Sequence, residues 1–121
     1  LVVDDYLDAL EIYQTYLTFK GYRVATASSG ADAITIAQVE RPSLILMDLR
    51  MIGMSGTEAM QTLRADPAFA DVLIVAFTAH AMAAERAEAM KAGFDALISK
   101  PCLPDELVTA IERLLSEPRR R

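Results

Sequence analysis

The stretch Leu44-Ile45-Leu46-Met47-Asp48 runs four apolar residues together and ends on an aspartate. A continuous apolar run of this length, bounded by turn residues, is typical of a strand buried on both faces of a parallel sheet. Pro42 precedes the run and marks a turn before it. The stretch therefore predicts a buried strand with Asp48 at its carboxyl end.

Outward from this stretch, apolar runs of strand length alternate with segments whose apolar residues recur at helical spacing. The expected strands lie at residues 1–3, 23–26, 44–47, 72–77 and 97–99. The helical stripes between and after them are 7–17, 33–37, 59–63, an alanine-rich stretch ending at Gly93, and 107–115. This strict alternation predicts repeated βα units around a parallel sheet.

Connections between parallel strands cross over in a right-handed sense, so the helices must cover both faces of such a sheet. We therefore expect a three-layer, doubly wound α/β fold of the flavodoxin-like (βα)5 type. The parallel five-stranded sheet is expected to have the strand order 2-1-3-4-5.

Composition and length describe an ordinary globular protein, with 121 residues, 53% hydrophobic and 24% charged. The formal net charge of −5 argues against direct nucleic-acid binding, and no apolar run is long enough to span a membrane. Cys102 is the only cysteine, which excludes an internal disulfide. We expect a single domain over residues 1–121, trimmed at its start within the first strand, with residues 117–121 as a tail or the start of a linker.

Polar residues follow four of the expected strands. They are Asp4 and Asp5 after the first strand, Asp48 after the third, Thr78 after the fourth and Lys100 after the fifth. The carboxyl ends of parallel strands share one edge of the sheet, where ligands bind. In the order 2-1-3-4-5 the first and third strands flank the switch point, so Asp4, Asp5 and Asp48 should meet in one crevice.

Three carboxylates in one crevice repel one another. Two unit charges about 4 Å apart repel by about 4 kcal/mol at an effective dielectric of 20, so either one carboxyl is protonated or a cation lies among them. An all-oxygen set with no nearby His or Cys in sequence favours a hard ion such as Mg²⁺. Such a site suits phosphoryl transfer, for which Lys100 supplies a mobile positive charge and Thr78 a hydroxyl.

Four short motifs recur here in a familiar order. They are Val2-Val3-Asp4-Asp5, Met47-Asp48-Leu49, Thr78-Ala79 and Ser99-Lys100-Pro101. Asp5, Asp48, Thr78 and Lys100 follow one another at separations of 43, 30 and 22 residues. Over essentially its whole length the chain resembles the receiver domain of bacterial response regulators.

This resemblance implies that Asp48 accepts a phosphoryl group, with Mg²⁺ or Mn²⁺ as cofactor. Asp5 and Asp48 would contact the metal directly, Asp4 largely through water, and the backbone carbonyl of Arg50 would complete the protein ligands. Thr78 and Lys100 would hold the phosphoryl oxygens. The resemblance also implies a cis peptide bond between Lys100 and Pro101.

As a receiver, the chain would take its phosphoryl group from a histidine kinase or a histidine phosphotransfer protein of a two-component system or phosphorelay. It would signal by a conformational or binding change to a downstream protein or a fused output domain. It would be an enzyme only in assisting its own phosphorylation and dephosphorylation, and it would be cytoplasmic.

Two positions depart from the family pattern. Ile52 stands where a proline is usual, so the loop after Asp48 should be less restrained. Leu97 stands where an aromatic residue is usual, whose rotation accompanies movement of the threonine on activation. Phosphorylation should be unaffected, but the conventional threonine–aromatic switch is then in question.

His80, the only histidine, is expected to be a partly exposed residue at the rim of the site. Contact with the water that attacks the phosphoryl group is a hypothesis for it. A Ser-His-Asp hydrolase is not favoured, because no candidate nucleophile lies in a recognisable elbow.

Two alternatives remain at this point. A Mg²⁺-dependent phosphohydrolase of the haloacid-dehalogenase type also uses an aspartate after a strand, but it requires a second aspartate where Arg50 stands. A degenerate receiver that only binds partners would not need the acidic pair, Asp48, Thr78 and Lys100.

Overall fold

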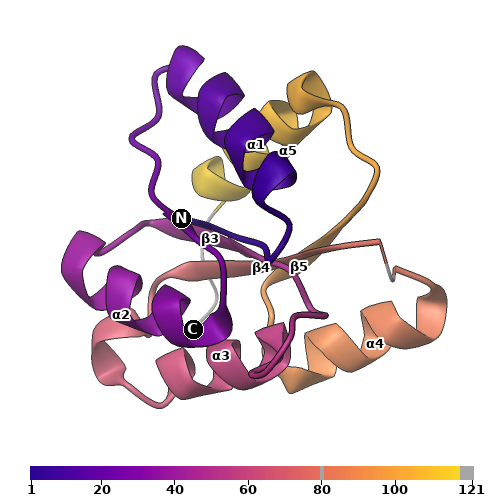
Figure 1. Ribbon diagram of the computed structural model, residues 1–121. Helices are drawn as coiled ribbons and strands as arrows, with labels where there is room; N and C mark the ends of the chain where they lie inside the picture. Colours follow the sequence, from indigo (N-terminus) through magenta and orange to yellow (C-terminus); the bar gives the residue numbers. More distant parts are fainter. Residues whose placement is uncertain (80, 118–121) are drawn as a thin grey trace.

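The computed structural model of the chain describes residues 1–79 and 81–117. These residues form five β-strands and five α-helices in alternation, with one short 3₁₀ helix, η1 (Figure 1). The strands are β1 Val2–Val3, β2 Thr26–Ala27, β3 Leu44–Met47, β4 Leu73–Thr78 and β5 Ala96–Ser99. The helices are α1 Leu7–Phe19, α2 Gly30–Glu40, α3 Gly56–Arg64, η1 Pro67–Phe69, α4 Ala83–Ala92 and α5 Pro104–Ser116.

The strands make one parallel sheet in the order β2-β1-β3-β4-β5. Helices α1 and α5 cover one face of the sheet, and α2, α3 and α4 cover the other (Figure 1). The doubly wound, three-layer α/β fold predicted from the sequence is therefore confirmed, and so is the predicted strand order.

The core consists of two apolar clusters, one on each side of the sheet. Ile45 and Met47 of β3 belong to the cluster on the side of α2, α3 and α4, whereas Leu46 belongs to the cluster on the side of α1 and α5. Successive side chains of a strand point to opposite faces. A strand with both faces buried must therefore be apolar throughout, which explains the run that precedes Asp48.

The prediction for the second strand was wrong in its bounds. Residues 23–26 were expected, but β2 is Thr26–Ala27. Val2 lies opposite Thr26 in the parallel ladder, so Arg23 and Val24 extend beyond the first residue of β1 and have no ladder partner in it.

Arg64 ties together several segments at the end of the sheet where β4 begins. Its guanidinium donates to the carbonyls of Phe69 and Val72, at 3.0 and 2.7 Å. It also pairs with the carboxylate of Asp95 at 2.5 Å, and that carboxylate accepts a hydrogen bond from the backbone N–H of Ile74. The end of α3 and the starts of β4 and β5 are thus held in one register.

Predictions for the remaining parts of the chain are not tested by the structure. His80 and the tail residues 118–121 lie outside the described residues. The domain boundaries and the trimmed start stay predictions. In the described part of the chain, none of the helices combines the length and the apolar character that crossing a bilayer requires.

Candidate functional site

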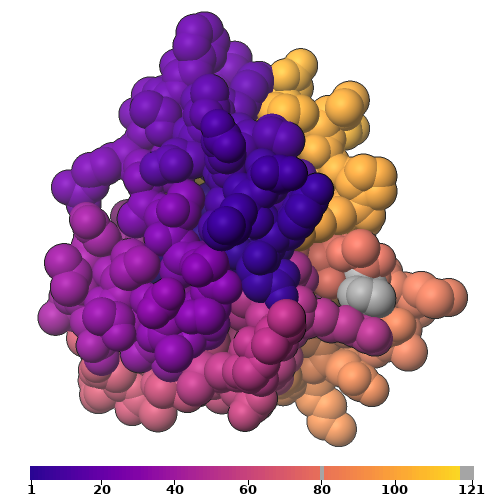
Figure 2. Space-filling model, in the orientation of Figure 1, coloured from indigo at the N-terminus to yellow at the C-terminus, as the bar shows by residue number. Residues whose placement is uncertain are grey.

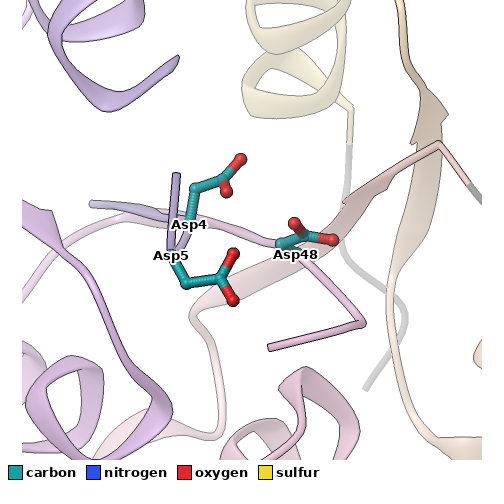
Figure 3. A group of neighbouring side chains, drawn as sticks. All are labelled: Asp4, Asp5 and Asp48. Atoms are coloured by element: carbon teal, nitrogen blue, oxygen red, sulfur yellow. The ribbon is translucent and has the colours of Figure 1, made fainter. Parts of the chain in front are cut away.

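Three aspartates meet at the carboxyl ends of β1 and β3. Asp4, Asp5 and Asp48 each place one carboxylate oxygen within 4.8 Å of the others, as predicted from their positions after strands (Figure 3). Asp4 is buried, Asp48 is partly buried and Asp5 is exposed. The group is therefore open to solvent on the side of Asp5.

The strand ladder sets this geometry. Val3 lies opposite Met47 in the parallel pair, and the backbone N–H of Asp48 donates to the carbonyl of Val3 at 3.0 Å. The residues that follow, Asp4 and Asp48, must then leave the sheet side by side. One oxygen of Asp4 accepts from the backbone N–H of Tyr6 at 3.0 Å, which fixes that side chain as α1 begins.

Lys100 reaches the same group from the end of β5. Its ammonium pairs with Asp4, and it lies 3.6 Å from an oxygen of Asp48. The Lys100–Pro101 peptide bond is cis, which confirms that prediction. In the space-filling view, indigo, magenta and orange parts of the chain lie next to one another on one face (Figure 2).

Thr78 ends β4 beside Lys100. It is fully buried, and its backbone carbonyl accepts a hydrogen bond from the backbone N–H of Lys100 at 2.9 Å. The next residue, Ala79, is exposed and small. A group bound beside Thr78 would therefore meet little steric obstruction from Ala79.

Burial and charge perturb two groups of the site. Burial raises the pKa of the Asp48 carboxyl above its ordinary value; the Lys100 ammonium opposes this rise, and the charge of Asp4 adds to it. Burial alone would lower the pKa of Lys100, but the hydrogen bond to Asp4 and the charge of Asp48 outweigh burial and raise it. The site therefore stabilises the charged form of Lys100 and destabilises the charged form of Asp48.

The loop between β3 and α3 is pressed against Asp48. A Cβ atom on Gly56 would lie only 1.9 Å from the carbonyl oxygen of Asp48, so only glycine fits there. The backbone N–H of Arg50 donates to Asp48 at 3.4 Å, and that of Ile52 donates to Asp5 at 3.2 Å. A proline at position 52 could not make the second bond, because it has no N–H.

Leu97, the other departure from the family pattern, is buried on the side of α2, α3 and α4. Its carbonyl accepts a hydrogen bond from the Arg86 guanidinium of α4 at 3.2 Å. The side chain thus fills apolar space, and it presents neither a ring nor a hydroxyl to Thr78.

Sequence reasoning missed two residues of the site. Phe77 and Tyr13 were read only as apolar positions of a strand and a helix. The Lys100 ammonium lies 5.0 Å from the centre of the Phe77 ring, and the Tyr13 ring meets Phe77 at 5.1 Å. Phe77 directly precedes Thr78, and this adjacency was the available signal.

The donor set fits a hard divalent cation. Three carboxylates offer oxygen ligands only, and the part of the chain described here places no His or Cys among them. The Asp5 side of the group is exposed, which leaves room for water ligands. Whether the backbone carbonyl of Arg50 joins them stays a prediction.

Comparison with known proteins identifies the family. Residues 1–112 match the model of the response regulator receiver domain. The chain is 37% identical over 115 residues to the probable transcriptional regulator ycf27 of Cyanophora paradoxa, covering 95% of the chain and 47% of that relative. It is 33% identical to the response regulator Rre1 of a Synechocystis strain, covering 96% of the chain and 51% of Rre1. The chain thus spans about half the length of these curated relatives.

Solved structures give the same result. The chemotaxis protein CheY4 of Vibrio cholerae superposes with a TM-score of 0.88 at 27% identity, covering 93% of each chain. The receiver domain of the sensor histidine kinase PA1611 of Pseudomonas aeruginosa superposes with a TM-score of 0.87 at 29% identity, covering 96% of this chain and 95% of that one. In that structure a magnesium ion is coordinated in the active-site cleft.

Proposed function

The chain belongs to the response regulator receiver domain family, the phosphoacceptor domains of two-component systems, and we propose that Asp48 is its phosphoacceptor. The observation that carries this proposal is the place of Asp48 between an acidic pair and an ammonium group. Lys100 lies 3.6 Å from it, and Asp4 and Asp5 bring their oxygens within 4.8 Å. This is the charge pattern that in-line phosphoryl transfer requires.

The chemistry assigned to Asp48 is nucleophilic attack. One carboxylate oxygen bonds to the phosphorus of a phosphohistidine, and the phosphorus–nitrogen bond breaks. The imidazole leaves with that electron pair and takes up a proton from solvent. Hydrolysis by water later regenerates the carboxylate, so the domain assists its own phosphorylation and dephosphorylation rather than turning over an external substrate.

Lys100 and Thr78 are assigned to the phosphoryl oxygens. The Lys100 ammonium is charged and already close to Asp48. A phosphoryl group on Asp48 adds negative charge at that point, so the ion pair with Lys100 strengthens. The Thr78 hydroxyl, at the end of the adjacent strand, would supply a hydrogen bond.

We assign a Mg²⁺ or Mn²⁺ ion to Asp5 and Asp48 directly, to Asp4 largely through water, and to the carbonyl of Arg50. A bound divalent ion neutralises charge on the transferring phosphoryl group. The exposed position of Asp5 and the all-oxygen donor set support this assignment. The magnesium ion in the PA1611 receiver supports it by analogy.

The proposal extends to partners. The phosphodonor would be a histidine kinase or histidine phosphotransfer protein, and the output would be a downstream protein or a fused domain. The probable transcriptional regulator ycf27 and the response regulator Rre1 are each about twice as long as this chain, which supports a fused output domain. We propose no direct contact of this domain with nucleic acid or membrane, and a cytoplasmic location stays a prediction.

The test is incorporation of phosphate from a small phosphoramidate donor, followed by intact-mass spectrometry. We expect one covalent phosphate with Mg²⁺ present, far less with a chelator, and none in Asp48→Asn. Asp71→Asn, an exposed change between η1 and β4 and outside the acidic group, is the matched control and should take up phosphate normally. Undiminished phosphate in Asp48→Asn would contradict the assignment of Asp48.

A further inference from the structure

An aromatic ring lies against the lysine that the proposed function assigns to the phosphoryl group. The Lys100 ammonium is 5.0 Å from the centroid of Phe77, and Phe77 is almost completely buried. This separation is within the range over which the face of an aromatic ring attracts a cation. The ammonium is therefore held by two carboxylates, Asp4 and Asp48, and by a ring.

A second ring fixes the orientation of the first. Tyr13, from α1, meets Phe77 with ring centroids 5.1 Å apart and ring planes at 67°. Edge-to-face pairs of this kind are favourable beyond the area they bury. Phe77 also belongs to the apolar cluster beneath α1 and α5, so its ring is held on several sides.

We propose that Phe77, held by Tyr13, is a positioning residue that keeps the Lys100 ammonium where a phosphoryl group on Asp48 will meet it. This inference rests on the proposed role of Lys100 in holding the phosphoryl oxygens. Nothing in the family pattern of Asp, Thr and Lys assigns a role to the residue before Thr78. Phe77 and Tyr13 would then form the aromatic side of the site, next to α1.

The physical reason lies in the flexibility of lysine. Its ammonium is a point charge on a four-carbon stem, which loses rotamer freedom when it is fixed. The ammonium contacts the carboxylates of Asp4 and Asp48, and phosphorylation changes the second of these contacts. The ring attracts the cation in either state, so the stem is ordered before the phosphoryl group arrives. Ordering in advance raises affinity.

A merely structural role for Phe77 must be distinguished from this one. The first readout is the NMR signal of the lysine ε-methylene group in the metal-free protein. The chain has three lysines, Lys20, Lys91 and Lys100, so assignment is simple, and exposed Lys91 gives the reference position. We expect the Lys100 signal to be shifted upfield by the Phe77 ring current and to return towards the Lys91 position in Phe77→Leu.

Phe94→Leu is the matched control for this readout. Phe94 is as buried as Phe77 but belongs to the cluster on the opposite face of the sheet. It should lose comparable packing while leaving the Lys100 signal unshifted from wild type. A Lys100 signal at the Lys91 position in the wild-type protein would overturn the proposal, since the ammonium would then not lie over the ring.

The second readout separates the phosphoryl group from the metal. Affinity for beryllofluoride, a phosphoryl mimic, is measured at saturating Mg²⁺, and affinity for Mg²⁺ is measured alone. We expect Phe77→Leu to weaken beryllofluoride binding about threefold to tenfold, the usual range for a partly desolvated cation–π contact. Mg²⁺ affinity should change by no more than about twofold, because the ring contacts the lysine and not the acidic group.

Fluorination of the ring removes the remaining ambiguity about packing. Trifluorophenylalanine at position 77 keeps the shape of the side chain but weakens its attraction for a cation. It should weaken beryllofluoride binding, whereas the same amino acid at position 94 should not. Equal beryllofluoride affinity in the wild type and in both position-77 variants would overturn the role of Phe77. Failure of the wild type itself to bind beryllofluoride would instead overturn the proposed function.

Discussion

At the scale of single residues, Asp48 is held in an environment that opposes its own charge. Burial is the largest cause, the charge of Asp4 adds to it, and Lys100 offsets it only in part. The pKa of Asp48 in the folded chain is therefore above its ordinary value. A nearby positive charge would stabilise the ionised form of Asp48, which is the form that acts as a nucleophile. This agrees with the proposed need for a divalent ion.

This environment predicts that the metal-free protein is stabilised when Asp48 loses its charge. Because the folded-state pKa is raised, ionisation of Asp48 costs stability above that raised value, and the cost disappears as pH falls below the ordinary value near 3.8. Asp48→Asn should therefore raise the free energy of unfolding at pH 7, because the amide carries no charge. Urea denaturation with a chelator present measures it.

The pH dependence provides the control. The advantage of Asp48→Asn over wild type should shrink as the pH is lowered towards and below the ordinary value of 3.8, because Asp48 then becomes protonated in the folded and in the unfolded chain. Asp71→Asn is the reference variant, because Asp71 is exposed, and it should change the free energy of unfolding little. Asp66→Asn would not serve, because the Asp66 side chain caps η1. If the Asp48→Asn protein were less stable than wild type at pH 7, the attraction of Lys100 for the Asp48 carboxylate would outweigh the cost of its burial and its repulsion by Asp4, and the prediction would fail.

At the scale of elements, the loop from β3 to α3 positions the acceptor through a contact between main chains. The backbone N–H of Gly56 donates to the carbonyl of Leu49 at 3.0 Å, and α3 starts at this glycine. Ser55 caps the helix in a capping box with Glu58. The carbonyl of Asp48 therefore packs directly on the first turn of α3.

Gly56→Ala should disrupt this contact. The added Cβ would lie 1.9 Å from the Asp48 carbonyl oxygen and 3.0 Å from the Cα of Leu49, so the backbone has to move. We expect a loss of about 1–3 kcal/mol in the free energy of unfolding. Mg²⁺ affinity should fall as well, because Asp48 moves with its backbone. Thermal denaturation and a Mg²⁺ titration measure the two effects.

Gly53→Ala is the matched control in the same loop. Gly53 has φ of 82°, and a Cβ there would meet no atom within 4 Å. It should cost about 1 kcal/mol through backbone strain alone. If Gly53→Ala and Gly56→Ala had equal effects on Mg²⁺ affinity, the packing of α3 against Asp48 would not position the site.

At the scale of the whole molecule, the sequence was sufficient for the fold and for the principal side chains of the site. Asp4, Asp48 and Lys100 each directly follow a strand and Thr78 is the last residue of one, although the sequence predicted it just after the strand. Parallel strands bring their carboxyl ends to one edge. Local order along the chain therefore becomes proximity in space. The bounds of β2 were not predictable in this way, because they depend on its register with β1.

The aromatic contact of Lys100 could not be predicted for a related reason. Phe77 and Tyr13 show as apolar positions in their elements, and the sequence does not state which way a lysine stem lies across the sheet. Leu97 faces the other side of the sheet from Phe77. The aromatic residue beside the site is therefore Phe77, on the side of α1 and α5. On the other side, Leu97 is aliphatic where the family usually has an aromatic residue.

The central claim is that phosphate is carried by Asp48, and borohydride trapping tests it most directly. Borohydride reduces an acyl phosphate to an alcohol, so a phosphorylated aspartate becomes homoserine, which peptide mass spectrometry locates. After treatment with a small phosphoramidate and Mg²⁺, we predict homoserine at position 48. Homoserine at position 4 or 5, with Asp48 unchanged, would contradict the account.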